Sequence, residues 1–468
     1  MSWVPGSVRH PARLEAGRAP GLATALALAL AFAGAAGCSS PSPLEVPPLT
    51  DVRMEGDVVV WNSTDAAMGA VRYGPAAGRY LHVAYPAGAD RPDVAFVHEH
   101  RVRLLSVAPG DTVRLEAMGR LASGALSVSD EFTFVMPAGL LHSPKLSWTM
   151  IDVGFGDSHL LTMPSTFRHV LIDAGERRDA GNVERFLAAS KVTRLDAVLA
   201  THIHEDHIGG MVGESGFTDD GVLETLDVGA FLDSDDHSGS RYAYDELLGI
   251  LARRAIPREI VRAGDTQATN PAVAWDPSVA VEVLHAGHGH ATGGASEDDW
   301  INNDSVVMRV SYGLVNFMLG GDAESPVQSA LVAAHPLTLV SEVLKVHHHG
   351  VADASEPTYL AAVHPRVGLI PITTYESNSG TLPSGVVLDR LHQRLIDVYA
   401  SDRAEPLGVS LTGDTGINVT VVTDGAGYEV TIEPSQSRHW PGTGAPWTAV
   451  APVAPAPARV TGTEGGRP

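Results

Sequence analysis

Three histidines and one aspartate stand close together near the middle of the chain. Residues 201–210 read Thr-His-Ile-His-Glu-Asp-His-Ile-Gly-Gly, which places His202, His204, Asp206 and His207 within six positions. Imidazole and carboxylate groups are usual ligands of zinc and of neighbouring divalent metals. The spacing predicts that His202 and His204 reach one ion while Asp206 and His207 turn toward a second. The alternative, an exposed polar loop, requires this spacing to arise by chance at the end of a strand.

The segments around this cluster predict the elements that position it. The apolar run Leu195–Ala200 is typical of a buried β-strand, and it ends where the cluster begins. Gly209 and Gly210 are predicted to let the backbone turn tightly into a following helix. Val315–Leu319 predicts a further strand and Val183–Ala189 a helix. Strands that alternate with helices and are apolar on both faces imply an α/β fold whose sheets are covered by helices.

Several further segments, together with the motif His-x-His-x-Asp-His-x-Gly-Gly, resemble a known family. These segments are Asp152–Asp157, Val170–Gly175, Asn302–Ser305, Leu319–Glu324 and Leu344–Gly350. Their order and spacing resemble the metallo-β-lactamase-fold hydrolases, and in particular the metallo-β-lactamase domain of competence-type DNA-uptake channels. The resemblance covers residues 145–432 and implies a four-layer αββα sandwich with two metals at one edge. The family hydrolyses many kinds of ester and amide, so the resemblance says less about substrate than about fold.

The resemblance also implies roles for individual residues. It makes Asp322 the carboxylate that bridges both metals, and it places His349 as a ligand of the second metal. It places His348 beside the site as a proton donor or a phosphate contact, so that Asp206, His348 and His349 form the catalytic set. Asp173 is implied to be a carboxylate behind the ligands that orients a histidine. Asp157 is left unassigned.

Two positions depart from the family pattern. Many members of the superfamily carry a third histidine for the first metal near Asn303, where this chain has asparagine. His202 and His204 are therefore predicted to share their ion with water, with Asn303 or with a loop histidine, and to bind it less tightly than the second ion. Leu382 stands where a related loop carries histidine. The candidate loop histidines are His285, His288 and His290.

The beginning of the chain predicts export. Residues 1–37 combine a basic flank, the apolar run Leu22–Ala33 and small residues before Cys38, as secretory signals do. The residues before Cys38 resemble the lipobox of bacterial lipoproteins, although Ala35 replaces the more common leucine. We expect cleavage before Cys38, lipidation of its sulfur and attachment to the membrane of the cell envelope through a tether at residues 38–48. Ordinary cleavage to a soluble product is the alternative.

A predicted β-sandwich stands between the tether and the hydrolase-like region. Residues 49–138 contain short alternating strands, including Asp57–Thr64 and Ala70–Gly74, separated by turn residues. The pattern is similar to fibronectin type III modules, which space or dock catalytic domains. The alternative is a module that binds carbohydrate or protein. Residues 433–468 are rich in proline, alanine and glycine and are predicted to be a disordered tail.

Composition excludes some classes of function. The 468-residue chain has a formal net charge of −23 and one cysteine, Cys38. One cysteine excludes an intrachain disulfide and a multi-cysteine metal site. The negative charge disfavours a long nucleic-acid footprint, because a polyanion is repelled unless the site has a positive field of its own.

The residues favour a metal-dependent hydrolase at the cell surface. Two cations, zinc or manganese, can activate a hydroxide at neutral pH and stabilise a departing oxygen. The predicted substrate is a small or flexible phosphoester or phosphodiester, and the competence-type branch suggests nuclease activity as one form. Two alternatives from other classes stay open. One is a surface protein that binds metal without catalysis, and the other is an interaction protein whose β module does the binding.

Overall fold

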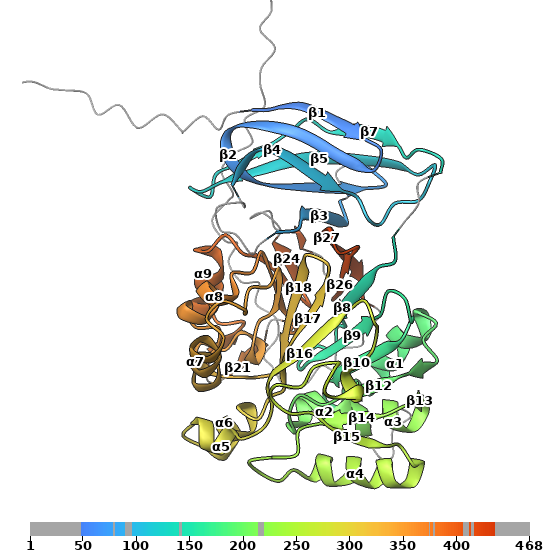
Figure 1. Ribbon diagram of the computed structural model, residues 1–468, viewed down its shortest axis with the longest axis vertical. Helices are drawn as coiled ribbons and strands as arrows, with labels where there is room; N and C mark the ends of the chain where they lie inside the picture. Colours follow the sequence, from blue (N-terminus) through green and yellow to red (C-terminus); the bar gives the residue numbers. More distant parts are fainter. Residues whose placement is uncertain are drawn as a thin grey trace, which may run out of the picture. The chain divides into compact units, whose positions relative to one another are not determined.

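The computed structural model describes residues 48–77, 80–88, 96–139, 143–213, 220–373, 375–377, 380–405, 411–412 and 416–435 (Figure 1). The predicted signal peptide and Cys38 lie outside these ranges, as do most of the predicted tether and tail. Among the described residues, no helix is both long and apolar enough to cross a membrane.

Two β-sheets pack face to face in the hydrolase region. The first has the order β15-β14-β12-β10-β9-β8-β26-β27, and the second has the order β16-β17-β18-β19-β20-β23-β24-β25. The strands of the first sheet are β8 (Leu146–Met150), β9 (Ser158–Thr162), β10 (His169–Ala174), β12 (Ala197–Leu199), β14 (Phe231–Asp233), β15 (Arg258–Ile260), β26 (Ile417–Thr423) and β27 (Gly427–Pro434). Those of the second are β16 (Ala280–His285), β17 (Val307–Tyr312), β18 (Val315–Gly320), β19 (Val343–Lys345), β20 (Val367–Ile370), β23 (Asp397–Ala400), β24 (Arg403–Glu405) and β25 (Leu411–Thr412).

Helices cover the outer face of each sheet. Figure 1 shows one group in green beside the first sheet and another in orange beside the second. The first group is α1 (Ala180–Ala189), α2 (Glu205–Val212), α3 (Val222–Thr225) and α4 (Tyr242–Arg254). The second group is α7 (Ser325–Ala334), α8 (Pro357–Val363) and α9 (Gly385–His392). Two short helices, α5 (Gly289–Thr292) and α6 (Glu297–Asn302), lie between β16 and β17 in the chain.

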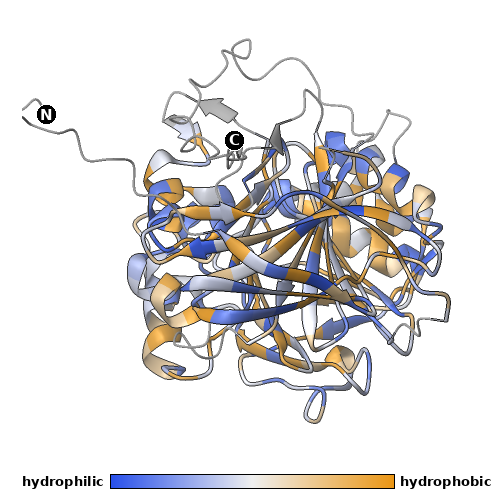
Figure 2. Cartoon of the chain, turned by 90° about the horizontal axis from the view of Figure 1, so that it is seen from above, coloured by the Kyte–Doolittle hydropathy of each residue, from blue (hydrophilic) through white to orange (hydrophobic). Residues whose placement is uncertain are grey.

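Three buried clusters correspond to the three interfaces between these layers. Trp148 of the first sheet and Phe317 of the second meet between the sheets, with ring centroids 5.4 Å apart. Leu187 of α1 belongs to a second cluster under the first helical layer, and Leu360 of α8 to a third under the other. Bands of hydrophobic and hydrophilic residues alternate along the strands in Figure 2. The four-layer αββα prediction is confirmed.

The N-terminal β region has its own core around Trp61. Its strands are β1 (Leu49–Glu55), β2 (Val58–Gly74), β3 (His82–Pro86), β4 (Val97–Arg103), β5 (Thr112–Leu121), β6 (Leu126–Val128) and β7 (Phe132–Val135). Trp61 is fully buried and stacks on His100, with ring centroids 4.8 Å apart. These strands agree with the predicted β-sandwich, and the likeness to fibronectin type III stays a prediction.

One strand replaces two that the sequence predicted in this region. Asp57–Thr64 and Ala70–Gly74 were expected to be separate, but β2 runs through both. Its first part pairs with β1 and β4 and its last part with β5, with a register shift between Asn62 and Ala67. A bulge lets one strand change partners without a loop, which a period-two pattern cannot reveal.

The β region and the hydrolase region share a sheet. β3 pairs with β27 in antiparallel register from Gly427↔Pro86 to Thr431↔His82, and β3 also pairs with β2. The first hydrolase sheet therefore continues directly into the β region. Alternation within β3 and β27 predicts strands but does not show which strand each one meets.

Candidate metal centre

Four chain segments bring the predicted ligands to one edge of the two sheets. β10 and β12 are parallel, and they end before Gly175 and Ala200. β18 and β19 are also parallel, and they end directly before the Gly321–Asp322 turn and the segment Val346–His349. Because the carboxyl ends of parallel strands meet at the same edge of a sheet, residues far apart in the chain converge there.

Asp206, His207, Asp322 and His349 point ligand atoms at a common position. His349 Nε2 lies 3.1 Å from Asp206 Oδ2 and 3.3 Å from Asp322 Oδ2. His207 Nε2 lies 3.1 Å from Asp322 Oδ2 and 3.8 Å from Asp206 Oδ2. Metal–ligand bonds of about 2.0–2.2 Å in a tetrahedron place neighbouring ligand atoms roughly 3.3–3.6 Å apart. The four distances, from 3.1 to 3.8 Å, lie close to the spacing of ligand atoms around one divalent ion.

Two more carboxylates hold the imidazoles from behind. His207 Nδ1 lies 2.8 Å from Asp173 Oδ2, and His349 Nδ1 lies 3.3 Å from Asp157 Oδ1. Asp173 also accepts hydrogen bonds from the Thr201 amide at 2.8 Å and the Thr201 hydroxyl at 2.6 Å. Carboxylates in this place fix the ring orientation and make the other nitrogen the metal-binding one. Asp173 thus contacts a candidate ligand, and its role in orienting that ligand for a metal stays a prediction.

Asp157 belongs to this supporting layer although it lies among the ligands. Potential ligand atoms of Asp157, His207, Asp322 and His349 all fall within 4.8 Å of one another. Asp157, however, faces the Nδ1 side of both histidines, and its Oδ2 forms an ion pair with Lys345 at 2.6 Å. We therefore assign the fourth ligand position to Asp206.

Lys345 is a residue of the candidate site that the sequence analysis missed. It is fully buried, and its Nζ lies 3.1 Å from Asp322 Oδ1 and 2.7 Å from the Gly321 carbonyl oxygen. Burial opposes its charge, but Asp157 and Asp322 raise the pKa of Lys345 above its ordinary value. The ion pair fixes Asp322 so that Oδ2 faces the histidines. A lysine inside an apolar strand was the available signal, because lysine is almost never buried without a partner.

The charge of the site matches a divalent cation. Burial disfavours charge on His207, yet Asp322, Asp206 and the two supporting aspartates raise its pKa well above the ordinary value. Burial likewise opposes charge on His349, and contacts with Asp322 and its neighbours raise that pKa well above normal. Without a metal, protons on these rings balance the carboxylates. A cation bound at Nε2 would displace those protons and supply the same balance, so the residues fit a divalent metal.

His202 and His204 form a second pair beside this set. His202 Nε2 lies 3.1 Å from His204 Nδ1, and His202 Nδ1 lies 3.2 Å from the Thr201 hydroxyl. Burial lowers the pKa of both imidazoles, and the nearby charge of His207 lowers it further. Both rings therefore stay neutral, which is the form that binds a metal.

The predicted third partners of this pair have other contacts. The Asn303 side chain donates to the Gly293 carbonyl at 3.1 Å and to Glu324 Oε2 at 3.3 Å, and its oxygen accepts from the Glu324 amide at 3.0 Å. His285 Nε2 lies 2.9 Å from the Asn303 carbonyl oxygen, and His288 pairs with Asp236. The side chain of His290 lies outside the described residues. The weaker binding predicted for the first ion stays a prediction.

The histidines after β19 have three different environments. His347 is buried, with Nδ1 donating to the Gly320 carbonyl at 2.9 Å and Nε2 2.9 Å from the Tyr359 hydroxyl, and burial lowers its pKa to about 4. His348 Nε2 lies 4.0 Å from Asp322 Oδ2, and its side chain is 23% exposed. His347 is thus a packing residue, while His348 lies partly exposed beside Asp322.

Three residues of this site have strained backbones. Asp173, His348 and His349 all have left-handed backbones, with φ of 56°, 49° and 49°. Such conformations cost about 1–3 kcal/mol each for residues other than glycine and persist where the surroundings fix them. The hydrogen bonds of Asp173 and His349 supply that constraint.

Gly209 and Gly210 have a different role from the predicted one. Both lie inside α2, and neither has a positive φ. A Cβ on Gly210 would sit 2.0 Å from the Ala174 carbonyl oxygen, and one on Gly209 would sit 2.4 Å from the Arg177 amide nitrogen. They permit α2 to approach β10 closely, rather than permitting a turn. Leu382, where a histidine was expected, is half-buried against the core under α7–α9.

Residues 151–373 match the model of the metallo-beta-lactamase superfamily. This part of the chain is a metallo-β-lactamase superfamily domain. The domain is also similar to ComE operon protein 3 of Bacillus subtilis (strain 168), with 25% identity over 270 residues. That alignment covers 54% of this chain and 31% of the relative, so it spans about a third of the relative's length.

Solved structures show weaker likeness to the domain. CmlA, a diiron β-hydroxylase from Streptomyces venezuelae, is 13% identical with a TM-score of 0.29, covering 56% of this chain and 50% of that one. A metallo-β-lactamase variant from Cronobacter sakazakii is 14% identical with a TM-score of 0.28, covering 47% and 89%. The TM-scores are low, and the assignment therefore rests on the family match and on the site residues.

Proposed function

We propose that this protein is a cell-envelope hydrolase of small phosphoesters or phosphodiesters that uses two divalent metal ions. The observation that carries the proposal is the convergence of Asp206, His207, Asp322 and His349, beside the His202–His204 pair. A closed structural site needs one ion with four protein ligands. Here two neighbouring sets offer different numbers of protein ligands. Such an arrangement suits two ions that keep coordination positions free for water and substrate, as a catalytic centre needs.

Each residue has a defined task in this proposal. Asp206, His207 and His349 would hold one ion, His202 and His204 the other, and Asp322 both. Bound divalent ions lower the pKa of water and stabilise charge on the departing oxygen.

The supporting residues complete the site. Lys345 fixes Asp322 through Oδ1, 3.1 Å away, and Asp173 fixes the His207 ring. His348, partly exposed beside Asp322, would donate a proton to the leaving group or bind a phosphate oxygen.

Two observations support the substrate class. The chain is similar to ComE operon protein 3 and carries the motifs of the competence-type branch, which favours a phosphodiester. The net charge of −23 favours a small or flexible substrate over a long polyanion. Zinc and manganese both suit a set of imidazoles and carboxylates.

Membrane attachment is part of the same proposal. Lipidation of Cys38 would hold the hydrolase at the outer surface of a cell membrane, where a tether gives it access to soluble esters. Cys38→Ser should release the protein from the membrane fraction or leave it with an uncleaved signal. Unchanged fractionation with unchanged mass would contradict the lipid anchor without affecting the hydrolase assignment.

A metal measurement combined with an ester panel tests the proposed activity. Protein beginning at residue 39 is reconstituted with zinc or manganese and assayed on bis(p-nitrophenyl) phosphate, p-nitrophenyl phosphate, a thioester and a chromogenic lactam. We expect one to two ions per chain and the highest turnover on a phosphate ester. An absence of bound metal would defeat the proposal. Bound metal with no turnover on any ester would favour the binding protein without catalysis.

A further inference from the structure

A cavity lies at the end of the domain opposite the metal centre. It has a volume of about 590 Å³, and both the β region and the hydrolase domain line it. Glu342 and Arg366, which line it, directly precede β19 and β20, whereas Val346–His349 and Pro371 directly follow those strands. Strands of three and four residues span about 10–13 Å, so the two sites are separate.

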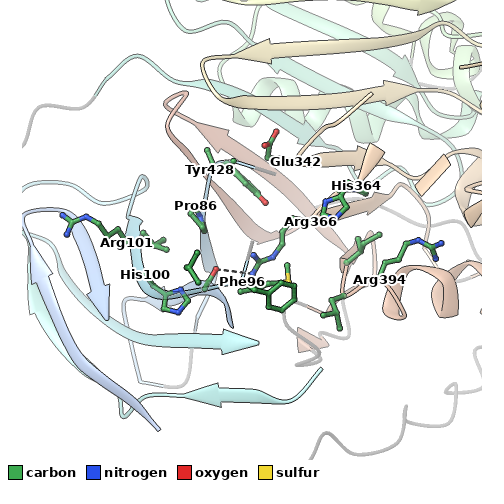
Figure 3. Close-up of a pocket in the computed structure, with 18 of the residues that line it drawn as sticks. Pro86, Phe96, His100, Arg101, Glu342, His364, Arg366, Arg394 and Tyr428 are labelled. Carbon is green, nitrogen blue, oxygen red and sulfur yellow. Dashed lines mark hydrogen bonds between the residues drawn. The ribbon is translucent and has the colours of Figure 1, made fainter. Parts of the chain in front are cut away.

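Apolar side chains from both regions form most of the cavity wall. Met68, Phe96 and Val97 come from the β region, and Leu360 and Tyr428 come from the hydrolase domain. Figure 3 shows Phe96 and Tyr428 among the lining side chains. A volume of this size lies in the range of small-molecule sites, which combine an apolar lining with a few polar groups.

Arg366 is the polar group that distinguishes this cavity. It is only 9% exposed, and its Nη2 donates a hydrogen bond to the Gly69 carbonyl at 3.2 Å (dashed line in Figure 3). Its guanidinium lies 5.1 Å from the centre of the Tyr85 ring. Its Nε has no hydrogen-bond partner, and no carboxylate of the described residues forms an ion pair with Arg366. Buried carboxylates do lie nearby, with Glu342 in the cavity wall and Asp397 bonded to the Tyr85 hydroxyl, so what Arg366 lacks is a direct ion pair. A buried guanidinium without a direct ion pair is costly, so this position favours an anionic ligand.

The neighbouring arginines have partners for their charged groups, whereas Arg366 has no ion pair. Arg120 is also buried, but it forms an ion pair with Asp397 at 2.7 Å. Arg394 lines the same cavity, and its two terminal nitrogens donate to the carbonyls of Arg390 and Pro357. Figure 3 places Arg366 amid the lining residues, with the Arg394 guanidinium directed outward.

The nearby histidine reports the same positive field. Burial, followed by the charge of Arg366, lowers the pKa of His100 to about 4. His100 lines the cavity as a neutral ring, stacked on Trp61 and 2.9 Å from the Ser63 hydroxyl. A neutral ring forms no ion pair with Arg366.

We propose that this cavity binds a small organic carboxylate with an apolar body. The carboxylate would pair with Arg366 through Nε, and the apolar body would lie against Phe96, Leu360 and Tyr428. One buried guanidinium balances one negative charge. Because Glu99 and Glu342 line the same cavity, a phosphate dianion would be less well accommodated.

Binding of 4-phenylbutyrate to the purified full-length, metal-loaded protein tests this proposal. Calorimetry should show one saturable site, and the melting temperature should rise with ligand concentration, because a ligand that binds the native state stabilises it. The neutral 4-phenylbutanol and the dianionic 4-phenylbutyl phosphate, which have similar apolar bodies, should each bind at least roughly tenfold more weakly.

Three variants assign the binding to the cavity. Arg366→Met should weaken phenylbutyrate binding roughly 10- to 100-fold, because it removes the charge that pairs with the carboxylate. Val97→Trp should fill the apolar part and abolish binding. Arg394→Met, the matched control, should bind within about twofold of the native protein, since its guanidinium has other partners. Absence of saturable binding, unchanged binding by Arg366→Met, or equal binding of the alcohol or the phosphate would overturn the proposal.

Discussion

The metal centre and the junction between the β region and the hydrolase domain both bury charge, but they balance it differently. At the junction, Asp397 pairs with Arg120 at 2.7 Å, and Glu429 accepts hydrogen bonds from the Tyr73 hydroxyl at 2.5 Å and from the Leu105 amide at 2.9 Å. At the metal centre, Lys345 pairs with Asp157 and Asp322, whereas Asp173 and Asp206 contact histidine side chains or neighbouring hydrogen-bond donors. Four carboxylates there share one lysine.

The difference separates buried charges that stabilise the fold from buried charges that bind an ion from solution. A buried carboxylate with its own cation or donors needs nothing further, and removing its partner destabilises the protein. An excess of carboxylates around imidazoles instead needs protons or a cation from solution. By the same reasoning, Arg366 is a buried cation proposed to bind an anion from solution, as the carboxylates of the metal centre are proposed to bind a cation. It lies beside the junction, whose other buried charges have partners within the protein.

Asp322→Asn should have the largest effect. It removes the carboxylate proposed to hold both ions, so both should be lost and turnover should fall roughly a thousandfold or more. Elemental analysis and turnover on the best phosphate ester measure the two effects. Asp227→Asn, which changes an exposed aspartate that pairs with Arg194, is the control and should keep metal and activity. Full activity in Asp322→Asn would refute the two-metal assignment.

The two ligand sets should differ in affinity for metal. Titration of zinc into apo-protein should give two phases, because one set has four protein ligands and the other chiefly His202 and His204. His207→Ala should abolish the tighter phase and His202→Ala the weaker one, with losses of at least roughly tenfold in affinity. Loss of the same phase in both variants would show that the two sets act as one site.

Arg120→Met should destabilise the protein without affecting metal binding. It leaves Asp397 buried and without its cation, which should lower the free energy of unfolding by about 3–5 kcal/mol. Urea denaturation measures this change. Arg101→Met is the matched control, because Arg101 is 52% exposed and pairs with Glu55 at the surface, where solvent screens the pair, so the loss should be much smaller. Equal losses in both variants would remove the distinction between the junction and the surface.

His100 should make the stability of the folded protein depend on pH, and this should be the smallest of the four expected effects. Its pKa is about 4 in the folded protein and near 6.5 when unfolded, so the unfolded state binds a proton first as pH falls. Its contribution is therefore complete above about pH 6.5 and is lost progressively down to about pH 4, by about 3 kcal/mol. His100→Gln should flatten this part of the stability profile. An identical pH dependence in both proteins would show that the native ring titrates normally.

The sequence was most informative where the candidate ligands lie close together in the chain. His202 to His207 lie within six positions, and the structure puts them at the end of β12 as the apolar run predicted. Asp322 and His349 could be added only by resemblance, because nothing in their own segments shows that they meet Asp206. Lys345 and Asp157 were harder still, since their ion pair depends on two strands in different sheets.

The junction could not be predicted for a related reason. Each strand of the β region has a recognisable pattern of alternating residues, but this pattern does not show which strand it pairs with. β2 also changes its pairing partner without a break in the strand. The cavity around Arg366 exists only because residues 68–102 and 342–428 come together. A lone arginine in the sequence has no feature that distinguishes it from a surface residue.

The pairing of β3 with β27 has a consequence for synthesis of the protein. The His82 and Thr431 side chains that meet across this pair are 349 residues apart in the chain. At translation rates of 5–20 residues per second, β3 would wait roughly 20–70 s for its neighbour. During that time its edge can pair with other chains, so crowded ribosomes and high expression should favour aggregation of nascent protein before the sheet is complete.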